Sequence, residues 1–124
     1  MGYVILFFGF VAAYMIGSIP TAYIFGRVLK GIDIREYGSG NTGATNVFRV
    51  IGKAPGIIVL IIDIIKGYVS ATYLASGFMY LAPVTRPELY RILAGLSVIA
   101  GHNWTLFLNF KGGKGVAASA GVVI

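Results

Sequence analysis

Long apolar runs alternate with short polar segments along this chain of 124 residues. Three runs, at about residues 3–25, 54–77 and 89–108, are long enough to cross a hydrocarbon core about 30 Å thick as helices. A fourth run, residues 116–124, would rise only about 13 Å as a helix. The pattern predicts an all-α integral membrane protein. We expect one multi-span helical bundle over residues 1–124, with three full transmembrane helices and the start of a fourth.

The first run has no charged side chain and is interrupted in its second half by Pro20. Because proline cannot donate a backbone hydrogen bond, we expect the helix to bend or end close to this residue. A secretory signal peptide is the alternative interpretation of an N-terminal apolar run. No basic residue precedes this run, and it is longer than the usual apolar part of a signal peptide, so a retained membrane helix is favoured.

Composition supports a membrane protein and narrows its partners. Only 11% of the residues are charged, whereas a soluble domain carries about 25%. The net charge is +6, but the basic residues lie mostly between the apolar runs, with no separate basic face for nucleic acid. The sequence has no Cys, which excludes disulfides and thiolate ligands, and its one His cannot form a His-rich metal site. We expect no metal and no cofactor.

The distribution of basic residues predicts the orientation in the membrane. Five of them flank or lie within the segment between the first two runs: Arg27, Lys30, Arg35, Arg49 and Lys53. Two more, Lys111 and Lys114, follow the third run, whereas the connection between the second and third runs holds only Arg86, with Arg91 just beyond it. By the positive-inside rule, the N-terminus lies outside and both polar loops face the cytoplasm.

The first polar loop, residues 38–46, reads GSGNTGATN. Glycine allows close approach of a ligand to the backbone, and Ser, Thr and Asn supply short hydrogen-bonding groups. Arg49, just beyond, can bind a phosphate through two hydrogen bonds. The candidate residues here are Gly38, Ser39, Gly40, Asn41, Thr42, Asn46 and Arg49. Residues 45–51 are expected to form a short helix, and the alternation over residues 30–40 is compatible with a short strand or an interfacial segment.

The second polar loop, residues 111–115, reads KGGKG. Successive backbone N–H groups in a Gly-rich turn form an anion-binding concavity, although the spacing is not that of a Walker A loop. The candidate residues are Lys111, Gly112, Gly113, Lys114 and Gly115. A basic loop at the lipid headgroups is the simpler alternative. We expect the two loops to meet around an anionic ligand.

Further polar residues lie inside the apolar runs or at their ends. Asp63 and Lys66 share one helical face, and two roles remain open: a mutual ion pair that fixes the helix, or a charge from Lys66 directed at an anionic substrate. His102 and Asn103 lie near the end of the third run. His102 is either a structural hydrogen-bonding residue, which we favour, or a general base. Trp104 is expected to be an anchor at the membrane interface.

Four segments in order, GSIPTAYIFGR, GSGNTGATNVFR, DIIKG and GHNWTLFLNFKGGKGVA, closely resemble the bacterial acyl-phosphate glycerol-3-phosphate acyltransferases, the PlsY family. The resemblance implies a bacterial inner-membrane enzyme that transfers a fatty acyl group from acyl phosphate to the sn-1 hydroxyl of glycerol 3-phosphate. It also implies an essential Ser39 and Arg49 and a phosphate-binding loop at residues 111–115. A third family motif, with Asn or His and a Glu, has no counterpart before Ile124, so we expect an N-terminal part of an acyltransferase.

The predicted substrates, acyl phosphate and glycerol 3-phosphate, are anionic and suit the basic loops, while the acyl tail suits the bilayer. We expect Arg49 and Lys114 to bind phosphate, and Ser39 and Asn41 to orient the reacting groups, by proximity and charge stabilisation. Two alternatives remain open. One is a non-enzymatic transporter or channel subunit for phosphate-bearing solutes, which an interrupted helix and charges within a span would fit. The other is an enzyme that uses a thioester donor.

Overall fold

A computed structural model describes residues 2–82, 84–105 and 116–123, and over these ranges it is helical, with no strand. The predicted all-α class is therefore confirmed for the described part. The α-helices and the two shorter helical turns, in chain order, are α1 (Gly2–Ser18), α2 (Thr21–Lys30), η1 (Ile34–Glu36), α3 (Ala44–Val50), α4 (Lys53–Val69), η2 (Ser70–Leu74), α5 (Ala75–Leu81), α6 (Pro87–Asn103) and α7 (Val116–Val123).

The first predicted span is a broken helix. α1 ends at Ser18 and α2 begins at Thr21, so the break lies at Pro20, as the missing backbone donor predicts. The helical region nevertheless continues five residues beyond the predicted end at residue 25, to Lys30. Gly31, with φ 64°, then ends α2 in the left-handed conformation that glycine adopts at little cost.

The second predicted span is longer than expected, and the third is shifted. α4, the π-helical turn η2 and α5 follow one another without a gap from Lys53 to Leu81, so the helix passes the predicted end at residue 77. α6 begins two residues early because Pro87, whose missing N–H costs nothing in a first turn, occupies its first position. It ends at Asn103, not at residue 108, and Trp104 already has a non-helical backbone.

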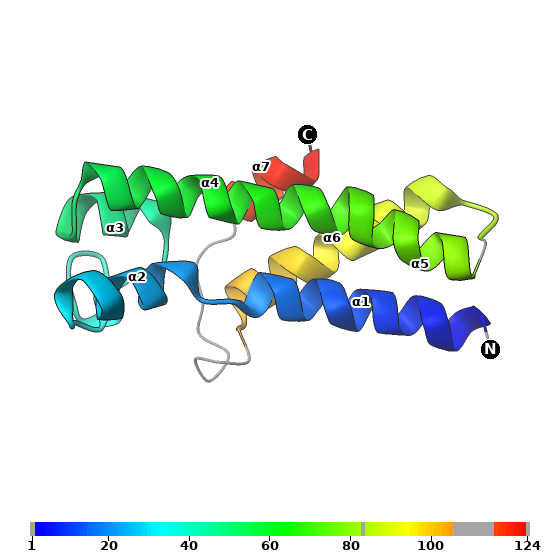
Figure 1. Cartoon of the computed structure of the whole chain (residues 1–124), viewed down its shortest axis with the longest axis horizontal. Helices are drawn as coiled ribbons and strands as arrows, with labels where there is room; N and C mark the ends of the chain where they lie inside the picture. Colours follow the sequence, from blue (N-terminus) through cyan, green and yellow to red (C-terminus); the bar gives the residue numbers. More distant parts are fainter. Residues whose placement is uncertain (1, 83, 106–115, 124) are drawn as a thin grey trace.

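Within the described residues, two helical stretches are long and apolar enough to cross a membrane, Gly2–Lys30 and Lys53–Leu81, whereas the sequence predicts three full spans. The two stretches run side by side in Figure 1, while α6 packs mainly against α1 and α7 packs against α4. Glycine permits the close contact of α1 with α6, because a Cβ at Gly17 or at Gly101 would collide with a backbone carbonyl of the other helix. Small residues serve the same purpose at helix contacts in membrane proteins.

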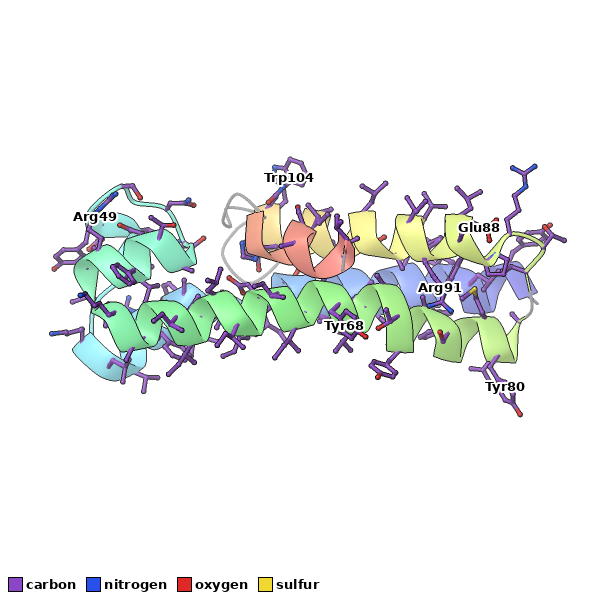
Figure 2. The ribbon with its side chains drawn as sticks, turned by 90° about the horizontal axis from the view of Figure 1, so that it is seen from above. Arg49, Tyr68, Tyr80, Glu88, Arg91 and Trp104 are labelled. Carbon is purple, nitrogen blue, oxygen red and sulfur yellow. The ribbon has the colours of Figure 1, made fainter. Side chains whose placement is uncertain are left out.

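The two ends of the bundle differ in character. The end of α2, the turn η1 and α3 gather at one end, and the N-terminus lies at the other, beside the connection from α5 to α6 (Figure 1). Figure 2 shows Arg49 at the first end and Tyr80, Glu88 and Arg91 toward the second. Large apolar side chains such as Phe7 (61% exposed), Ile61 (51%) and Leu96 (56%) cover the outside, which suits contact with lipid or with further helices.

Candidate functional site

The segment before the first Gly-rich loop is fixed by local ionic contacts. Asp33 precedes η1 and accepts a hydrogen bond from the backbone N–H of Arg35 at 3.0 Å. The two side chains also form an ion pair at 2.7 Å. The side-chain hydrogen bond from Arg35 is the main reason that the pKa of Asp33 lies below its usual value. This local capping favours a tight turn over extended backbone, so the suggested strand is absent from this segment.

Arg35 also contributes to a stack of charged and aromatic groups. Its guanidinium lies over the ring of Tyr23, 5.2 Å from the centroid, and that of Arg27 lies 5.6 Å from the same centroid. Cations over a tyrosine face are attracted by the ring quadrupole. The stack ties the turn η1 to α2, so the chain enters the Gly-rich loop from a defined position.

Two glycines of the loop adopt backbone conformations that favour glycine. Gly38 has φ 55° and Gly40 has φ 75°, both in the left-handed region. Space is also restricted, because a Cβ at Gly38 would collide with Oδ1 of Asn46 and one at Gly40 would lie 3.0 Å from the carbonyl oxygen of Arg35. The glycines therefore shape the loop by their backbone conformation and by their lack of a side chain.

Asn46 lies at the centre of the loop, on α3, and is 1% exposed. Its Oδ1 accepts a hydrogen bond from the backbone N–H of Ser39 at 3.1 Å. Its Nδ2 donates to three backbone carbonyls, those of Ile34 (3.3 Å), Tyr37 (3.0 Å) and Asn41 (3.0 Å). The sequence places Asn46 among the substrate-binding candidates, whereas all of its contacts in the structure are within the protein. Asn46 lies on a helix, eight residues after Gly38. This spacing gives no clear signal in the sequence that the side chain bonds to the loop backbone.

The remaining candidates of the first loop are more accessible. Ser39 is exposed, and its Oγ accepts a hydrogen bond from the N–H of Asn41 at 3.3 Å. Thr42 is 6% exposed, and its hydroxyl has no partner within the described structure. Arg49 is exposed on α3 and forms no ion pair with any described residue (Figure 2). The loop thus presents a hydroxyl and a guanidinium at the same end of the bundle.

A second polar cluster lies at the break between α1 and α2. The predicted ion pair between Asp63 and Lys66 is confirmed, at 3.0 Å, and both side chains are almost fully buried. Lys66 Nζ also donates to the carbonyl of Ile19, and Thr105 Oγ1 donates to that of Ser18. These two acceptors are carbonyls beside the break, where helical hydrogen bonds are lost. We call Ser18, Ile19, Asp63, Lys66, His102 and Thr105 the junction.

His102 belongs to the junction as a buried side chain, 8% exposed, close enough to Asp63 and Lys66 for their charges to act on it. The next residue, Asn103, has a buried Oδ1 with no hydrogen-bond partner within the described structure. The sequence does not single out Thr105, although a polar residue directly after a helix end is a signal for such a contact. Of the open roles for Lys66, the structure shows the ion pair.

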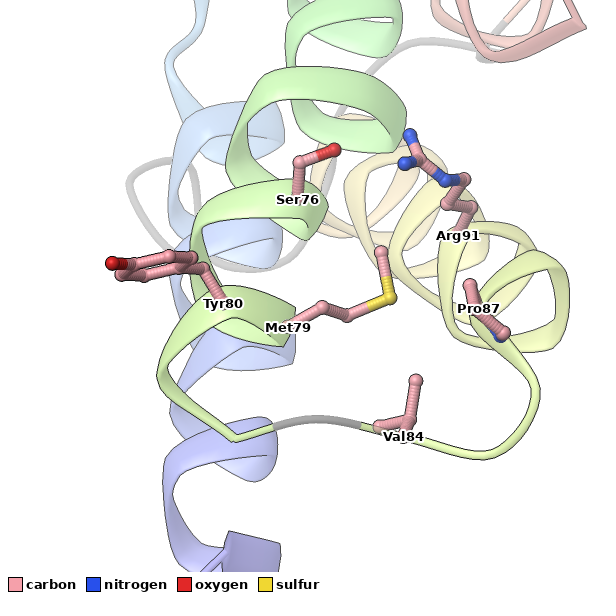
Figure 3. A pocket seen from close by; sticks show the side chains of 6 residues that line it. All are labelled: Ser76, Met79, Tyr80, Val84, Pro87 and Arg91. Carbon is pink, nitrogen blue, oxygen red and sulfur yellow. The ribbon is translucent and has the colours of Figure 1, made fainter.

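A shallow surface pocket of about 380 Å³ lies between α5 and α6, in the half of the bundle away from Arg49. Its lining consists of Ser76, Met79, Tyr80, Val84, Pro87 and Arg91, with Ser76, Met79 and Arg91 facing one another across it (Figure 3). The walls are mainly apolar around a single guanidinium, and no Gly-rich backbone contributes. It therefore lacks the features of the predicted phosphate site.

The second predicted loop lies outside the described residues, namely Lys111, Gly112, Gly113, Lys114 and Gly115. Its meeting with the first loop stays a prediction. The structure brings Ser39, Asn41 and Asn46 together in one hydrogen-bonded unit, with Gly38 packed against Asn46. It also places His102 close enough to Lys66 for the charge of Lys66 to act on it.

A family model described as glycerol-3-phosphate acyltransferase matches residues 7–124. The chain belongs to this family. It is 50% identical over 116 residues to the glycerol-3-phosphate acyltransferase of Pelodictyon phaeoclathratiforme, with 90% of this chain and 49% of the relative covered. It is 50% identical over 119 residues to that of Chlorobaculum tepidum, with 92% and 51% covered. The chain thus spans about half the length of the curated relatives it matches, and the resemblance found in the sequence is confirmed.

Solved structures agree with the family. The crystal structure of PlsY, an integral membrane glycerol 3-phosphate acyltransferase, in its glycerol 3-phosphate form is similar with a TM-score of 0.81 and 38% sequence identity. The alignment covers 95% of this chain and 56% of PlsY. The lysophosphatidic acid form gives a TM-score of 0.77 at 37% identity, over 95% of this chain and 55% of that one. At this identity and coverage, the fold of the described helices is that of the family.

Proposed function

We propose that the protein to which this chain belongs transfers a fatty acyl group from acyl phosphate to the sn-1 hydroxyl of glycerol 3-phosphate, as an early step of phospholipid synthesis. The observation that carries the proposal is the ordered Gly-rich loop, which leaves the Ser39 hydroxyl and the Arg49 guanidinium accessible at the basic end of a family member. The named ligand states of PlsY, glycerol 3-phosphate and lysophosphatidic acid, are the expected acceptor and product.

The chemistry needs anion binding and orientation more than a strong nucleophile. Arg49 would hold a phosphate through two charge-assisted hydrogen bonds, and Lys114 with the glycines of residues 111–115 would bind a second. The sn-1 hydroxyl attacks the acyl carbonyl, a C–O bond forms, and the bond from the carbonyl carbon to the phosphate oxygen breaks. The departing phosphate accepts the hydroxyl proton, so the products are lysophosphatidic acid and inorganic phosphate. Ser39 and Asn41 orient the reacting groups.

A membrane location and a cytoplasmic active site complete the proposal. Two stretches have the length and composition of membrane spans, and the acyl tail of the donor would stay among lipid or helices. The N-terminus and the first Gly-rich loop lie at opposite ends of the bundle (Figure 1). With basic loops inside, the N-terminus would face outward from a bacterial inner membrane and the loop would face the cytoplasm.

The junction bears on the transporter alternative. A broken helix beside midspan charges is a feature of many transporters, in which unwound carbonyls bind the transported ion. Here two carbonyls at the break accept hydrogen bonds from Lys66 and Thr105. The carbonyls at the break are thus occupied by contacts between helices. This favours an enzyme over a transporter.

The test measures acyl transfer in detergent. Two samples are compared: the protein encoded by the whole natural reading frame, and the 124-residue chain alone. Labelled glycerol 3-phosphate is supplied with either acyl phosphate or acyl-CoA, and lysophosphatidic acid is measured. We expect product with acyl phosphate only, and a loss of activity in the Arg49→Ala and Lys114→Ala variants. Arg86→Ala, at the opposite end of the bundle, is the matched control.

Three results would contradict parts of the proposal. Transfer from acyl-CoA alone would assign a thioester donor. Full activity in both Arg49→Ala and Lys114→Ala would remove the site assignment. Absence of transfer by the protein in its natural frame, together with uptake of glycerol 3-phosphate into proteoliposomes, would establish the transporter instead.

A further inference from the structure

Every hydrogen-bonding atom of the Asn46 side chain has a partner inside the protein. A carboxamide offers two N–H donors and one oxygen, and here the donors serve three carbonyls while the oxygen accepts from Ser39. The side chain is also 1% exposed. A group in this situation cannot bind substrate without giving up contacts inside the protein. Its effect on the reaction must therefore pass through the residues that it holds.

The surroundings of Asn46 specify a carboxamide. On the Nδ2 side lie three carbonyl oxygens, from Ile34, Tyr37 and Asn41, and on the Oδ1 side lies a single N–H group. A carboxylate would keep the bond to the N–H of Ser39 but would place a negative oxygen against the three carbonyls. A buried, unpaired charge of this kind is strongly unfavourable. Asparagine and aspartate, although of equal size, are thus not interchangeable here.

The position of Asn46 connects the two accessible groups of the loop. Through Oδ1 it fixes the backbone of Ser39, and on α3 it lies three residues, about one helical turn, before Arg49. Gly38, in the left-handed conformation, lets the chain pass directly over the Asn46 oxygen. The separation of the Ser39 hydroxyl from the helix that carries Arg49 is therefore set by the Asn46 carboxamide.

We propose that Asn46 is a positioning residue, which holds the Ser39 backbone at a fixed place relative to Arg49 and does not itself contact substrate. The inference rests on the proposed function of the loop. It predicts a particular pattern in the Asn46→Asp variant: the turnover number falls while the KM for acyl phosphate changes little, because the groups proposed to bind phosphate, Arg49 and residues 111–115, are unchanged. A displacement of about 1 Å in a reacting group costs about a hundredfold in rate.

The pH dependence of the variant's activity separates this role from a general loss of packing, which would not depend on pH in the same way. When the new carboxyl of the Asn46→Asp variant is protonated, it is neutral and regains one O–H donor for the three carbonyls. We therefore expect the activity of the variant, divided by that of the wild type at the same pH, to rise severalfold as the pH is lowered from about 8 to about 5. Because burial beside carbonyls raises the pKa of such a carboxyl, the recovery begins above the ordinary carboxyl range.

A matched control separates this effect from that of added charge. Ala54→Asp introduces the same carboxylate at an exposed position in the first turn of α4, away from the loop. Its activity should remain within a few-fold of the wild type, and the ratio should not rise between pH 8 and pH 6, where an exposed carboxyl stays ionised. An equal loss in Ala54→Asp, or a ratio for Asn46→Asp that does not change with pH, overturns the proposal.

If the Asn46→Asp variant does not fold, a second variant tests the proposal. Asn46→Ser is neutral and retains one donor but is too short to reach the N–H of Ser39. Hydrogen–deuterium exchange of residues 37–43 should be faster in this variant than in the wild type, while exchange within the long helices α1, α4 and α6 stays as in the wild type. Unchanged exchange with unchanged turnover overturns the role of Asn46. Absence of acyl transfer by the wild type, in contrast, overturns the proposed function, and the two failures are thus distinguishable.

Discussion

The junction and the first Gly-rich loop are two polar regions in a very apolar chain, and they use their polar groups in opposite ways. In the junction, Lys66 pairs with Asp63 and binds the Ile19 carbonyl, and both charged side chains are buried. In the loop, the carboxamide of Asn46 is buried and satisfied, whereas Ser39 and Arg49 remain exposed. The junction therefore has the character of a structural contact. The loop has the character of a binding site, in which a buried structural contact supports exposed groups.

The difference shows that charge within an apolar run is a weak guide to a ligand site. Lys66 and Arg49 are both basic residues in or beside apolar segments. The position of an acid three residues before Lys66 supplies it with an internal partner, which Arg49 lacks among the described residues. Mutations of the junction should thus change stability first, and mutations at the exposed groups of the loop should change activity first.

The largest effect is expected at the junction. Lys66→Met leaves the carboxylate of Asp63 buried without a partner, and the loss of one member of a buried pair costs about 3–5 kcal/mol. We expect a decrease of this size in the free energy of unfolding, measured by denaturant titration in detergent micelles. Replacing both residues, as Asp63→Leu with Lys66→Met, should restore most of the stability. A single variant as stable as the wild type would show that the pair is solvated.

The next effect is on activity alone. Arg49→Lys keeps the positive charge but loses the planar pair of donors, and a lost charge-assisted hydrogen bond corresponds to about 2 kcal/mol, or about thirtyfold in kcat/KM. The melting temperature should not change, since Arg49 is exposed and forms no described ion pair. Arg86→Lys is the matched control. Equal activity of Arg49→Lys and wild type would show that Arg49 acts only as a point charge.

A smaller effect should test how the loop is built. Gly38→Ala costs about 1–2 kcal/mol for the left-handed conformation alone, and its Cβ also collides with Oδ1 of Asn46. In an Asn46→Ala background the collision is gone and only the backbone cost remains. The two substitutions should therefore be less than additive in the free energy of unfolding. Strict additivity would mean that Asn46 does not lie against Gly38 in solution.

Sequence reasoning predicted the helical class, the break at Pro20, the pairing of Asp63 with Lys66 and the Gly-rich loop, because periodicity, proline chemistry and local spacing are properties of short segments. It misplaced the helix ends at Lys30, Leu81 and Asn103. Such ends depend on packing against other helices. The partners of Asn46 could not be predicted either, since all four of its contacts reach back five to twelve residues to a turn whose shape only the fold defines.

The smallest effect belongs to the ion pair of Asp33 and Arg35, which lies at the surface of the loop region. Asp33→Asn removes the charge but keeps an oxygen for the N–H of Arg35. Because the side chain of Arg35 is 34% exposed and water screens the pair, we expect a loss of only about 0.5 kcal/mol in the free energy of unfolding at neutral pH.

The pH dependence of this small loss identifies its cause. The pKa of Asp33 is lower in the folded protein than its ordinary value of about 3.9, so the pair stabilises the fold above that pH and the stabilisation is lost as the pH falls through the lower, folded-state value. The difference between wild type and Asp33→Asn should be constant near neutral pH and should shrink as the pH falls below the ordinary value of an aspartate carboxyl. A difference for Asp33→Asn that persists in acid would assign its effect to the packing of η1 and not to charge.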